Sequence, residues 1–355
     1  MKRSVWLAAI GVAVGSAAGV AAIGAAGPHP RAVRRDADLA EIHEQLIPAW
    51  SASEGGARVA QLERLRGALI DPELEELFDR IAAPEAPAPG ELRLLVDRWN
   101  DTCKRSGHRW RLSGEVSGGR VTARTYRVVD ADDRVSVGGW SFPIEVRRRV
   151  DDRTPVDPWL GQVHRGSDGV VVLLDRVEAF TDDTVRPLLD PASDPARGPL
   201  ERAFAPTVRA QAAAAVGPEP GALVEWVARS IVVHEGRHGY DRATLGGQRI
   251  PCRGCPSDTT HVGALEGVAY LAGFADPSTG ALAMLQACAV LREAQLVPDR
   301  ASMIRFLTGE LAQGGCDAGP PPDLAARATA LSERTFGSAV EVSLPEPGWI
   351  TEGEP

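Results

Sequence analysis

Apolar residues recur at helical intervals in the first part of the chain. Leu39, Ile42 and Leu46 lie three or four residues apart, which is the spacing of one face of an α-helix. Similar intervals continue past a Pro/Ala-rich turn and end in an amphipathic stretch over 91–105. The pattern predicts a helical N-terminal region over 31–105.

The middle of the chain changes to a strand pattern. Short runs rich in Val, Thr, Trp and Tyr stand between Gly and Asp residues that favour turns. The apolar run Gly169–Leu174 also has the length of a single strand. We therefore expect a mostly antiparallel β-sheet over 106–178.

Helical spacing returns from Ala179 onward. The expected helices cover 221–241, 263–274, 279–296, 301–312 and 323–335. The sheet and these helices together predict an α+β fold, with one large domain over 106–343 whose helical part is 179–343. The tail over 344–355 is rich in Pro, Gly and acidic residues, and we expect it to lack structure.

The start of the chain has the features of a membrane or export segment. Lys2 and Arg3 precede an uncharged run from Ser4 to Gly27, which is long enough to span a bilayer as a helix. The run is also longer than the usual apolar core of a cleaved signal peptide. A retained transmembrane helix and a cleaved signal helix over 1–30 both fit. Either one predicts a cell-envelope protein, membrane-anchored or secreted, with its remaining chain outside the cytoplasm.

Composition and charge narrow the classes of function. The formal net charge is -9, whereas nucleic-acid binding needs a basic surface, so we expect no nucleic-acid partner. The five cysteines are an odd number, which leaves at least one outside the disulfides of the chain. Cys252 and Cys255 form a C-x-x-C, but a zinc knuckle would need a second one. In an oxidising compartment, this spacing predicts a local disulfide.

The strongest chemical signal is the stretch His234-Glu235-Gly236-Arg237-His238, at the end of an apolar helical segment. His234 and His238 are four residues apart, so both imidazoles lie on one helix face and can converge on one metal ion. Glu235 can take a proton from the attacking water and later pass it to a leaving amine. This is the H-E-x-x-H pattern of zinc hydrolases, and a chance match on a buried helix is the alternative.

A catalytic zinc ion needs a third protein ligand and one open position. In the metzincin arrangement the third ligand comes six residues after the second histidine, where this chain has Thr244. Asp241 lies only three residues after His238, and it would more naturally accept a hydrogen bond from an imidazole. Glu266, at the start of the next amphipathic stretch, is the candidate ligand. The alternative for Glu266 is an ordinary carboxylate stabilised by the helix dipole.

At these positions the sequence resembles the gluzincin metallopeptidases, in which H-E-x-x-H is followed by a Glu ligand on a second helix. Leu265-Glu266-Gly267-Val268-Ala269 is similar to the N-E-G-F-A element of the aminopeptidase branch, with Leu265 in place of Asn. The G-x-M-E-N exopeptidase signature is absent, so aminopeptidase specificity does not carry over. The likeness covers about residues 223–274.

The resemblance implies a zincin-like catalytic domain with Zn²⁺ held by His234, His238 and Glu266, and with Glu235 as the general base. It also implies that the edge strand of a sheet binds extended substrate by β-pairing. The run Gly169–Leu174 either supplies that edge or forms a buried central strand.

The oxyanion that develops during hydrolysis needs a hydrogen-bond donor near the metal. Tyr270, one turn after Glu266, and His261, in the loop before the second helix, are the candidates. Tyr240 is expected to pack against its neighbours, and Arg237 to pair with an acidic surface residue.

The leading hypothesis is an exported or membrane-anchored zinc peptidase that acts on a peptide or protein substrate, with the membrane contacted through the N-terminal helix. The alternative is a cell-envelope binding or scaffold protein with a structural or vestigial zinc site, in which the helical region over 31–105 does the binding. A zinc hydrolase acting on a non-peptide bond is a third possibility.

Overall fold

The computed structural model describes residues 39–151, 160–163, 169–219, 221–245, 248–291 and 298–350. The signal or anchor helix expected over 1–30 lies outside these residues. No helix within the described ranges is both long enough and apolar enough to cross a membrane.

The N-terminal helices pack around an apolar core of their own. They are η1 (Ile42–Leu46), α2 (Ile47–Ala52), α3 (Gly55–Ala68), α4 (Pro72–Ile81) and α5 (Pro89–Arg105). Helix α4 begins at Pro72 because the Asp71 carboxylate accepts hydrogen bonds from the first free backbone N–H groups. Trp50, Phe78 and Trp99 fill the core. The elements found over the described part of the predicted region, 39–105, are all helices, as expected.

Seven strands form one sheet, in the order β1-β2-β4-β3-β7, with β6 paired to β4 and β5 paired to β6. The strands are β1 (Trp110–Ser117), β2 (Arg120–Asp130), β3 (Arg134–Val137), β4 (Trp140–Arg149), β5 (Gly161–Val163), β6 (Val170–Leu173) and β7 (Val342–Ser343). Only the β4–β6 pair is parallel among the described pairings, so the predicted mostly antiparallel sheet is confirmed.

Two tight turns set the register of the sheet. Gly118 and Gly119 join β1 to β2, and Gly138 and Gly139 join β3 to β4, all with positive φ between 55° and 82°. Two-residue loops with positive φ at both positions form type I′ turns, whose twist matches that of the strands. The sequence therefore fixes both hairpins locally.

The C-terminal helices cover the other part of the sheet. They are α6 (Leu174–Phe180), η2 (Thr181–Val185), α7 (Arg186–Leu189), η3 (Pro191–Ala196), α8 (Pro199–Ala215), α9 (Ala222–Leu245), α10 (His261–Ala275), α11 (Gly280–Val290), α12 (Pro298–Leu311), η4 (Gly315–Ala318) and α13 (Leu324–Phe336). Together with the sheet they give the expected α+β fold.

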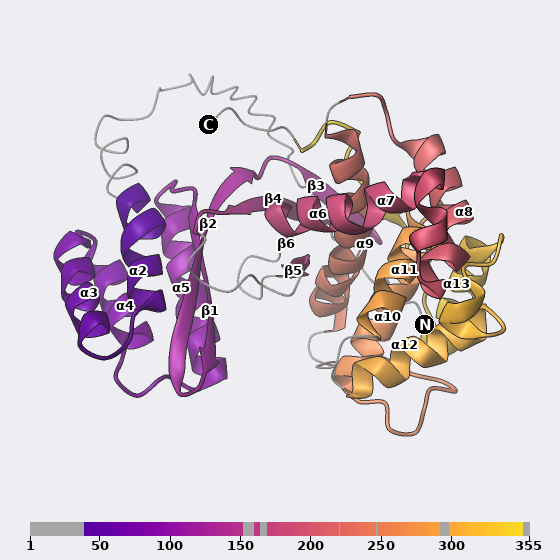
Figure 1. Cartoon of the computed structure of the whole chain (residues 1–355). Helices are drawn as coiled ribbons and strands as arrows, with labels where there is room; N and C mark the ends of the chain where they lie inside the picture. Colours follow the sequence, from indigo (N-terminus) through magenta and orange to yellow (C-terminus); the bar gives the residue numbers. More distant parts are fainter. Residues whose placement is uncertain are drawn as a thin grey trace, which may run out of the picture.

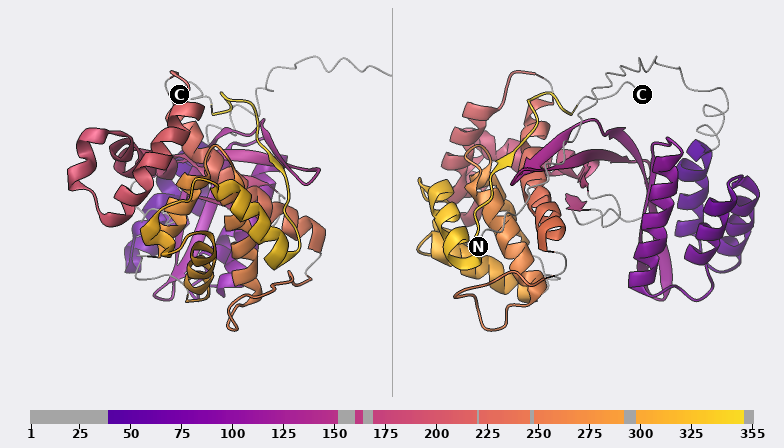
Figure 2. Two further views of the ribbon diagram at one scale, coloured as in Figure 1. Left: turned by 90° about the vertical axis from the view of Figure 1, so that its right-hand side faces the viewer. Right: turned by 180° about the vertical axis from the view of Figure 1, so that it is seen from behind.

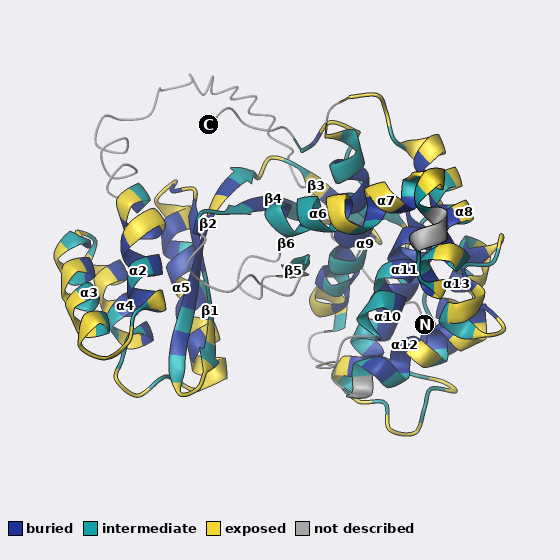
Figure 3. Ribbon diagram, in the orientation of Figure 1, coloured by how far each residue is buried: buried dark blue, intermediate teal, exposed yellow. Residues whose placement is uncertain are grey.

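The sheet connects two lobes. Figure 1 shows α2–α5 gathered beside β1 at one end and α6–α13 at the other, with β2 and β4 between them. The views from the side and from behind show the same division (Figure 2). We call η1 to α5, β1 and the first half of β2 the N-terminal lobe, and the rest the C-terminal lobe. Buried residues follow the strands and the facing sides of the helices (Figure 3).

The structure decides one open alternative and corrects one expectation. The run Gly169–Leu174 contains β6, which is buried and has β4 on one side and β5 on the other, so of the two alternatives the buried central strand is confirmed. The tail has no helix or strand over 344–350, yet it docks on α9. Its Trp349 is 3% exposed, and the Gly348 N–H donates to the Glu225 carboxylate at 2.8 Å. Burial of an aromatic ring outweighs the polar composition around it.

Two disulfides lie in the C-terminal lobe, Cys252–Cys255 and Cys288–Cys316. The first confirms the local bridge predicted from the C-x-x-C spacing. Cys103 remains a thiol and is buried in α5 of the N-terminal lobe. The second bridge joins the end of α11 to η4, so it brackets helix α12.

Glycines let helix α9 lie close to the sheet. A Cβ atom added at Gly236 would lie 3.2 Å from Val137 on β3, and one at Gly239 would lie 3.3 Å from Phe142 on β4. Both contacts are tighter than ordinary van der Waals distances, so these positions favour glycine. With this face against the sheet, the histidine face of α9 is directed toward α10.

We predict that Gly267→Ala destabilises the protein by about 1–2 kcal/mol. The steric cost of the added methyl group exceeds the stabilisation from the higher helix propensity of alanine. A Cβ atom at Gly267 of α10 would lie 2.8 Å from Met303 Sδ and 3.0 Å from Phe336 Cζ, and both side chains are buried. Gly309→Ala is the matched control, since its added methyl group meets nothing within 4 Å. Urea unfolding measures both; a Gly267→Ala protein as stable as Gly309→Ala would show that α10 is not packed this tightly.

Candidate metal centre

Helix α9 places His234 and His238 side by side. Their ring centroids are 4.8 Å apart, and the ring planes are nearly perpendicular. The four-residue spacing along an unbroken helix produces this arrangement directly. Both side chains are 16% exposed, so they lie at the wall of the lobe rather than in its core.

Helix α10 brings Glu266 to the two histidines. The helix starts after Thr260, whose hydroxyl accepts a hydrogen bond from the Gly263 N–H at 3.2 Å. Glu266 Oε2 lies 3.7 Å from His234 Nε2, and Oε1 lies 3.8 Å from His238 Nε2. One ligand atom from each of the three residues lies within 4.8 Å of the other two. The structure thus brings together the three residues that the sequence singles out as ligands.

The cluster has the dimensions of a metal site. Zinc ligands lie about 2.0–2.2 Å from the ion, so two ligand atoms of a tetrahedral site are roughly 3.4 Å apart. The observed separations of 3.7 and 3.8 Å are only slightly larger. Glu266 Oε2 is also buried and accepts no hydrogen bond from the described residues. Arg300 Nη2 lies 3.3 Å from this oxygen without a hydrogen bond of normal geometry, so the oxygen keeps acceptor capacity that fits a bound cation.

The pKa shifts of His238 and Glu266 favour the deprotonated forms that bind metal. Burial, reinforced by the neighbouring His234, lowers the pKa of His238 to about 3, so this imidazole is neutral at physiological pH. Burial pushes the pKa of Glu266 upward, but His234, His238 and Arg300 outweigh it and lower that pKa to about 2. Metal ligands must be deprotonated, and both side chains meet that condition.

Glu235 lies beside the cluster and next to the edge of the sheet. Burial raises the pKa of its carboxyl. Within the described residues it makes no hydrogen bond or ion pair, as expected for a side chain kept for a water or a substrate. A Cβ atom added at Gly161 of β5 would lie 3.6 Å from Glu235 Cγ and would also meet Ile231. Strand β5 therefore runs directly alongside this part of α9.

Tyr270 and Arg300 close the cluster from α10 and α12. The ring of Tyr270 lies 4.8 Å from that of His234, centroid to centroid. Arg300 Nε donates a hydrogen bond to the Tyr270 hydroxyl oxygen at 2.7 Å, and Arg300 Nη2 lies 3.3 Å from Glu266 Oε2. Burial raises the pKa of Tyr270 above its ordinary value. Arg300 was not predicted from the sequence, because no motif around it distinguishes it from the other lysines and arginines, of which the chain has 39 in all.

The structure does not bring His261 to the cluster. His261 is the first residue of α10, and its Nδ1 is buried without a hydrogen-bond partner among the described residues. Five residues along a helix correspond to a rotation of roughly 140° past a full turn, so His261 and Glu266 point in different directions.

The remaining candidates near the motif have other roles. Asp241 does not bond an imidazole, because Arg237 lies one turn earlier on α9 and donates to both of its oxygens at 3.0 Å. This ion pair is buried rather than at the surface, and Arg237 also donates to Ser338 at 3.1 Å. Thr244 is exposed and donates to the Tyr240 carbonyl oxygen, while Tyr240 itself packs against the Gly138 turn.

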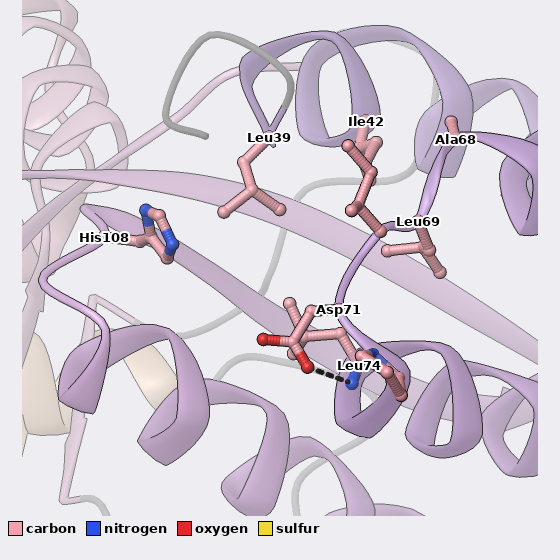
Figure 4. Close-up of a pocket in the computed structure, with 9 residues that line it drawn as sticks. Leu39, Ile42, Ala68, Leu69, Asp71, Leu74 and His108 are labelled. Atoms are coloured by element: carbon pink, nitrogen blue, oxygen red, sulfur yellow. Dashed lines mark hydrogen bonds between the residues drawn. The ribbon is translucent and has the colours of Figure 1, made fainter. Parts of the chain in front are cut away.

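A cavity of about 110 Å³ in the N-terminal lobe is distinct from the cluster. Leu39, Ile42 and Leu69 give it an apolar wall, as Figure 4 shows. Its one carboxylate, on Asp71, is already engaged as the cap of α4, seen as the dashed bond to Leu74 (Figure 4). The cavity therefore offers no convergent set of reactive groups.

We predict that metal binding distinguishes Glu266 from His261, although both belong to α10. Glu266→Ala should weaken zinc binding to the full chain more than about 100-fold. Substituting a residue that only orients a metal ligand already lowers metal affinity about 10–100-fold, and a direct ligand contributes more. His261→Ala should bind zinc as the wild type does. Chelator competition with elemental analysis measures both variants. Unchanged zinc binding in Glu266→Ala would remove Glu266 from the site.

Comparison with known proteins supplies no function for this chain. No protein-family model matches it, and no similar protein was found among curated proteins or solved structures. Any functional assignment therefore depends on the geometry of the cluster and on the chemistry of its side chains.

Proposed function

We propose that the chain is an exported or membrane-anchored zinc-dependent peptidase of the gluzincin type. The observation that carries the proposal is the convergence of His234, His238 and Glu266 on one point, with Glu235 beside it. Among the described residues this set supplies three ligands, which is the number that a catalytic zinc site takes from the protein.

The side chains of the cluster have separate roles in peptide hydrolysis. A bound zinc ion would polarise the scissile carbonyl group and lower the pKa of a water molecule. Glu235 takes a proton from the attacking water and returns it to the nitrogen of the leaving amine. Tyr270 donates its hydroxyl hydrogen to the carbonyl oxygen as that oxygen becomes negative. His234, His238 and Glu266 hold the ion.

The position of β5 supports a peptide as the substrate class. Among the described strands β5 pairs only with β6, so its other edge carries backbone groups that can pair with an extended chain. Because Gly161 lies against Glu235, a strand added at this edge would pass the proposed base. A sheet that packs on the H-E-x-x-H helix, with one edge strand beside the general base Glu235, also fits a zincin-like domain.

The disulfides support export. Cys252–Cys255 and Cys288–Cys316 both require an oxidising compartment to persist, such as the outside of the cytoplasmic membrane. The signal or anchor segment over 1–30 stays part of the proposal, as does attachment to a membrane.

A cell-envelope binding or scaffold protein with a structural zinc site is the second candidate. The N-terminal lobe favours it, since this lobe has its own apolar core and has the size of a small binding module. In that case the protein would hold zinc and cleave nothing.

We predict that Glu235→Gln keeps bound zinc and loses peptide cleavage by about 10²–10⁴-fold, the usual contribution of a general base. The amide has the size of the carboxylate but cannot accept the proton. Glu333→Gln, at an exposed position on α13, is the control and should cleave at the wild-type rate. Mass spectrometry of a mixed peptide library measures cleavage. Zinc-loaded wild type and Glu235→Gln that are equally inactive would instead support the scaffold function.

A further inference from the structure

Arg300 contacts two members of the cluster at once. Its Nε donates to the Tyr270 hydroxyl oxygen at 2.7 Å, and its Nη2 lies 3.3 Å from Glu266 Oε2. Nε and Nη2 form one edge of the planar guanidinium group, so a single rigid group spans the phenol and the carboxylate. Since Glu266 and Tyr270 are one turn apart on α10, the spacing of the two contacts is set by that helix.

The first contact decides where the Tyr270 hydrogen can point. A guanidinium group has only donors, so the phenol oxygen must be the acceptor in this hydrogen bond. The single hydroxyl hydrogen of Tyr270 is then directed away from Arg300 and can be donated to another group. The ring of Tyr270 stands 4.8 Å from that of His234, so this hydroxyl belongs to the wall of the metal cluster.

The second contact restrains the carboxylate. Glu266 Oε2 is buried, and two nitrogen atoms lie near it, Arg300 Nη2 at 3.3 Å and His234 Nε2 at 3.7 Å. Arg300 itself is mostly buried, with 18% of its side chain exposed. The contact with Arg300 Nη2 restrains Oε2, while the other oxygen, Oε1, lies 3.8 Å from His238 Nε2.

We propose that Arg300 is a positioning residue, which directs the Tyr270 hydroxyl hydrogen toward the oxyanion of the substrate and orients Glu266 for metal binding. The inference rests on the proposed function. The competing role for Arg300 is a structural one, in which its contacts merely fasten α12 to α10.

Arg300→Lys separates the two roles, because lysine keeps the positive charge but cannot span both partners with one planar edge. We expect this variant to fold with the stability of the wild type and to bind zinc about 10–100-fold more weakly, so its kinetics are measured with zinc in excess. Its kcat should fall about 10–100-fold, the usual cost of losing a group that orients a site, with KM nearly unchanged. Arg305→Gln, at an exposed position on the same helix, should have no effect.

A double-mutant cycle with Tyr270→Phe tests whether Arg300 acts through the hydroxyl. If it does, Arg300→Lys lowers kcat much less in the Tyr270→Phe background than in the wild type. A merely structural contact would give additive losses, and that result would overturn the inference. So would an Arg300→Lys variant with wild-type kcat.

A second measurement does not depend on activity. The chain has three tyrosines, so ¹³Cζ-tyrosine labelling of the full protein gives a short NMR spectrum, in which Tyr270→Phe identifies the Tyr270 signal. Arg300→Lys should shift this signal, and Arg305→Gln should leave it in place. An unchanged signal in Arg300→Lys would overturn the inference, whatever the kinetics. If zinc-loaded wild type cleaves no peptide while the signal does shift, the proposed function fails and the catalytic role of Arg300 fails with it.

Discussion

The close approach of helix α9 to the sheet is the constraint on which the rest of the C-terminal lobe depends. Gly236 and Gly239 have no side chains, so the helix settles against Val137 and Phe142 with one defined face inward. The rotation of the helix about its axis is thereby fixed, and the face with His234 and His238 must point toward α10. A larger residue at either glycine would turn or lift the helix. The cluster of His234, His238 and Glu266 is therefore a consequence of packing on the opposite side of α9.

The positive charge of Arg300 reduces the repulsion between the carboxylates of Glu235 and Glu266, which lie close together. Glu235 and Glu266 each carry one negative charge when ionised, and Arg300 carries one positive charge, so these three side chains then sum to one negative charge. Two carboxylates alone would repel each other, and the repulsion from Glu266 contributes to the raised pKa of Glu235. Arg300 relieves this repulsion but leaves a net negative charge at the cluster. A divalent cation is attracted to such a site, and it would bind the Glu266 oxygen, which has Arg300 nearby but accepts no hydrogen bond of normal geometry within the described residues.

The sequence predicts those features that depend on local spacing and misses those that depend on tertiary contacts. His234, Glu235 and His238 are fixed by one helical turn, and the glycine pairs fix the two hairpins. Glu266 was singled out because a catalytic zinc ion needs a third protein ligand and the next predicted helix carries this carboxylate. Arg300 was not, because its place at the site depends on how α12 crosses α10. The same holds for β5, a three-residue strand whose importance comes only from lying against Glu235.

The inventory of possible ligands favours a catalytic over a structural metal site. A structural zinc site is closed by four protein ligands, often cysteines. Here Cys252, Cys255, Cys288 and Cys316 are committed to disulfides, and Cys103 is buried in the other lobe. His261 points elsewhere on α10, and Asp241 is held by Arg237. Within the described part of the chain, no His, Cys, Asp or Glu side chain joins the three of the cluster. A metal ion held by these three residues would keep a fourth position for water beside the Glu235 carboxylate, and hydrolysis requires that arrangement, whereas a purely structural ion does not.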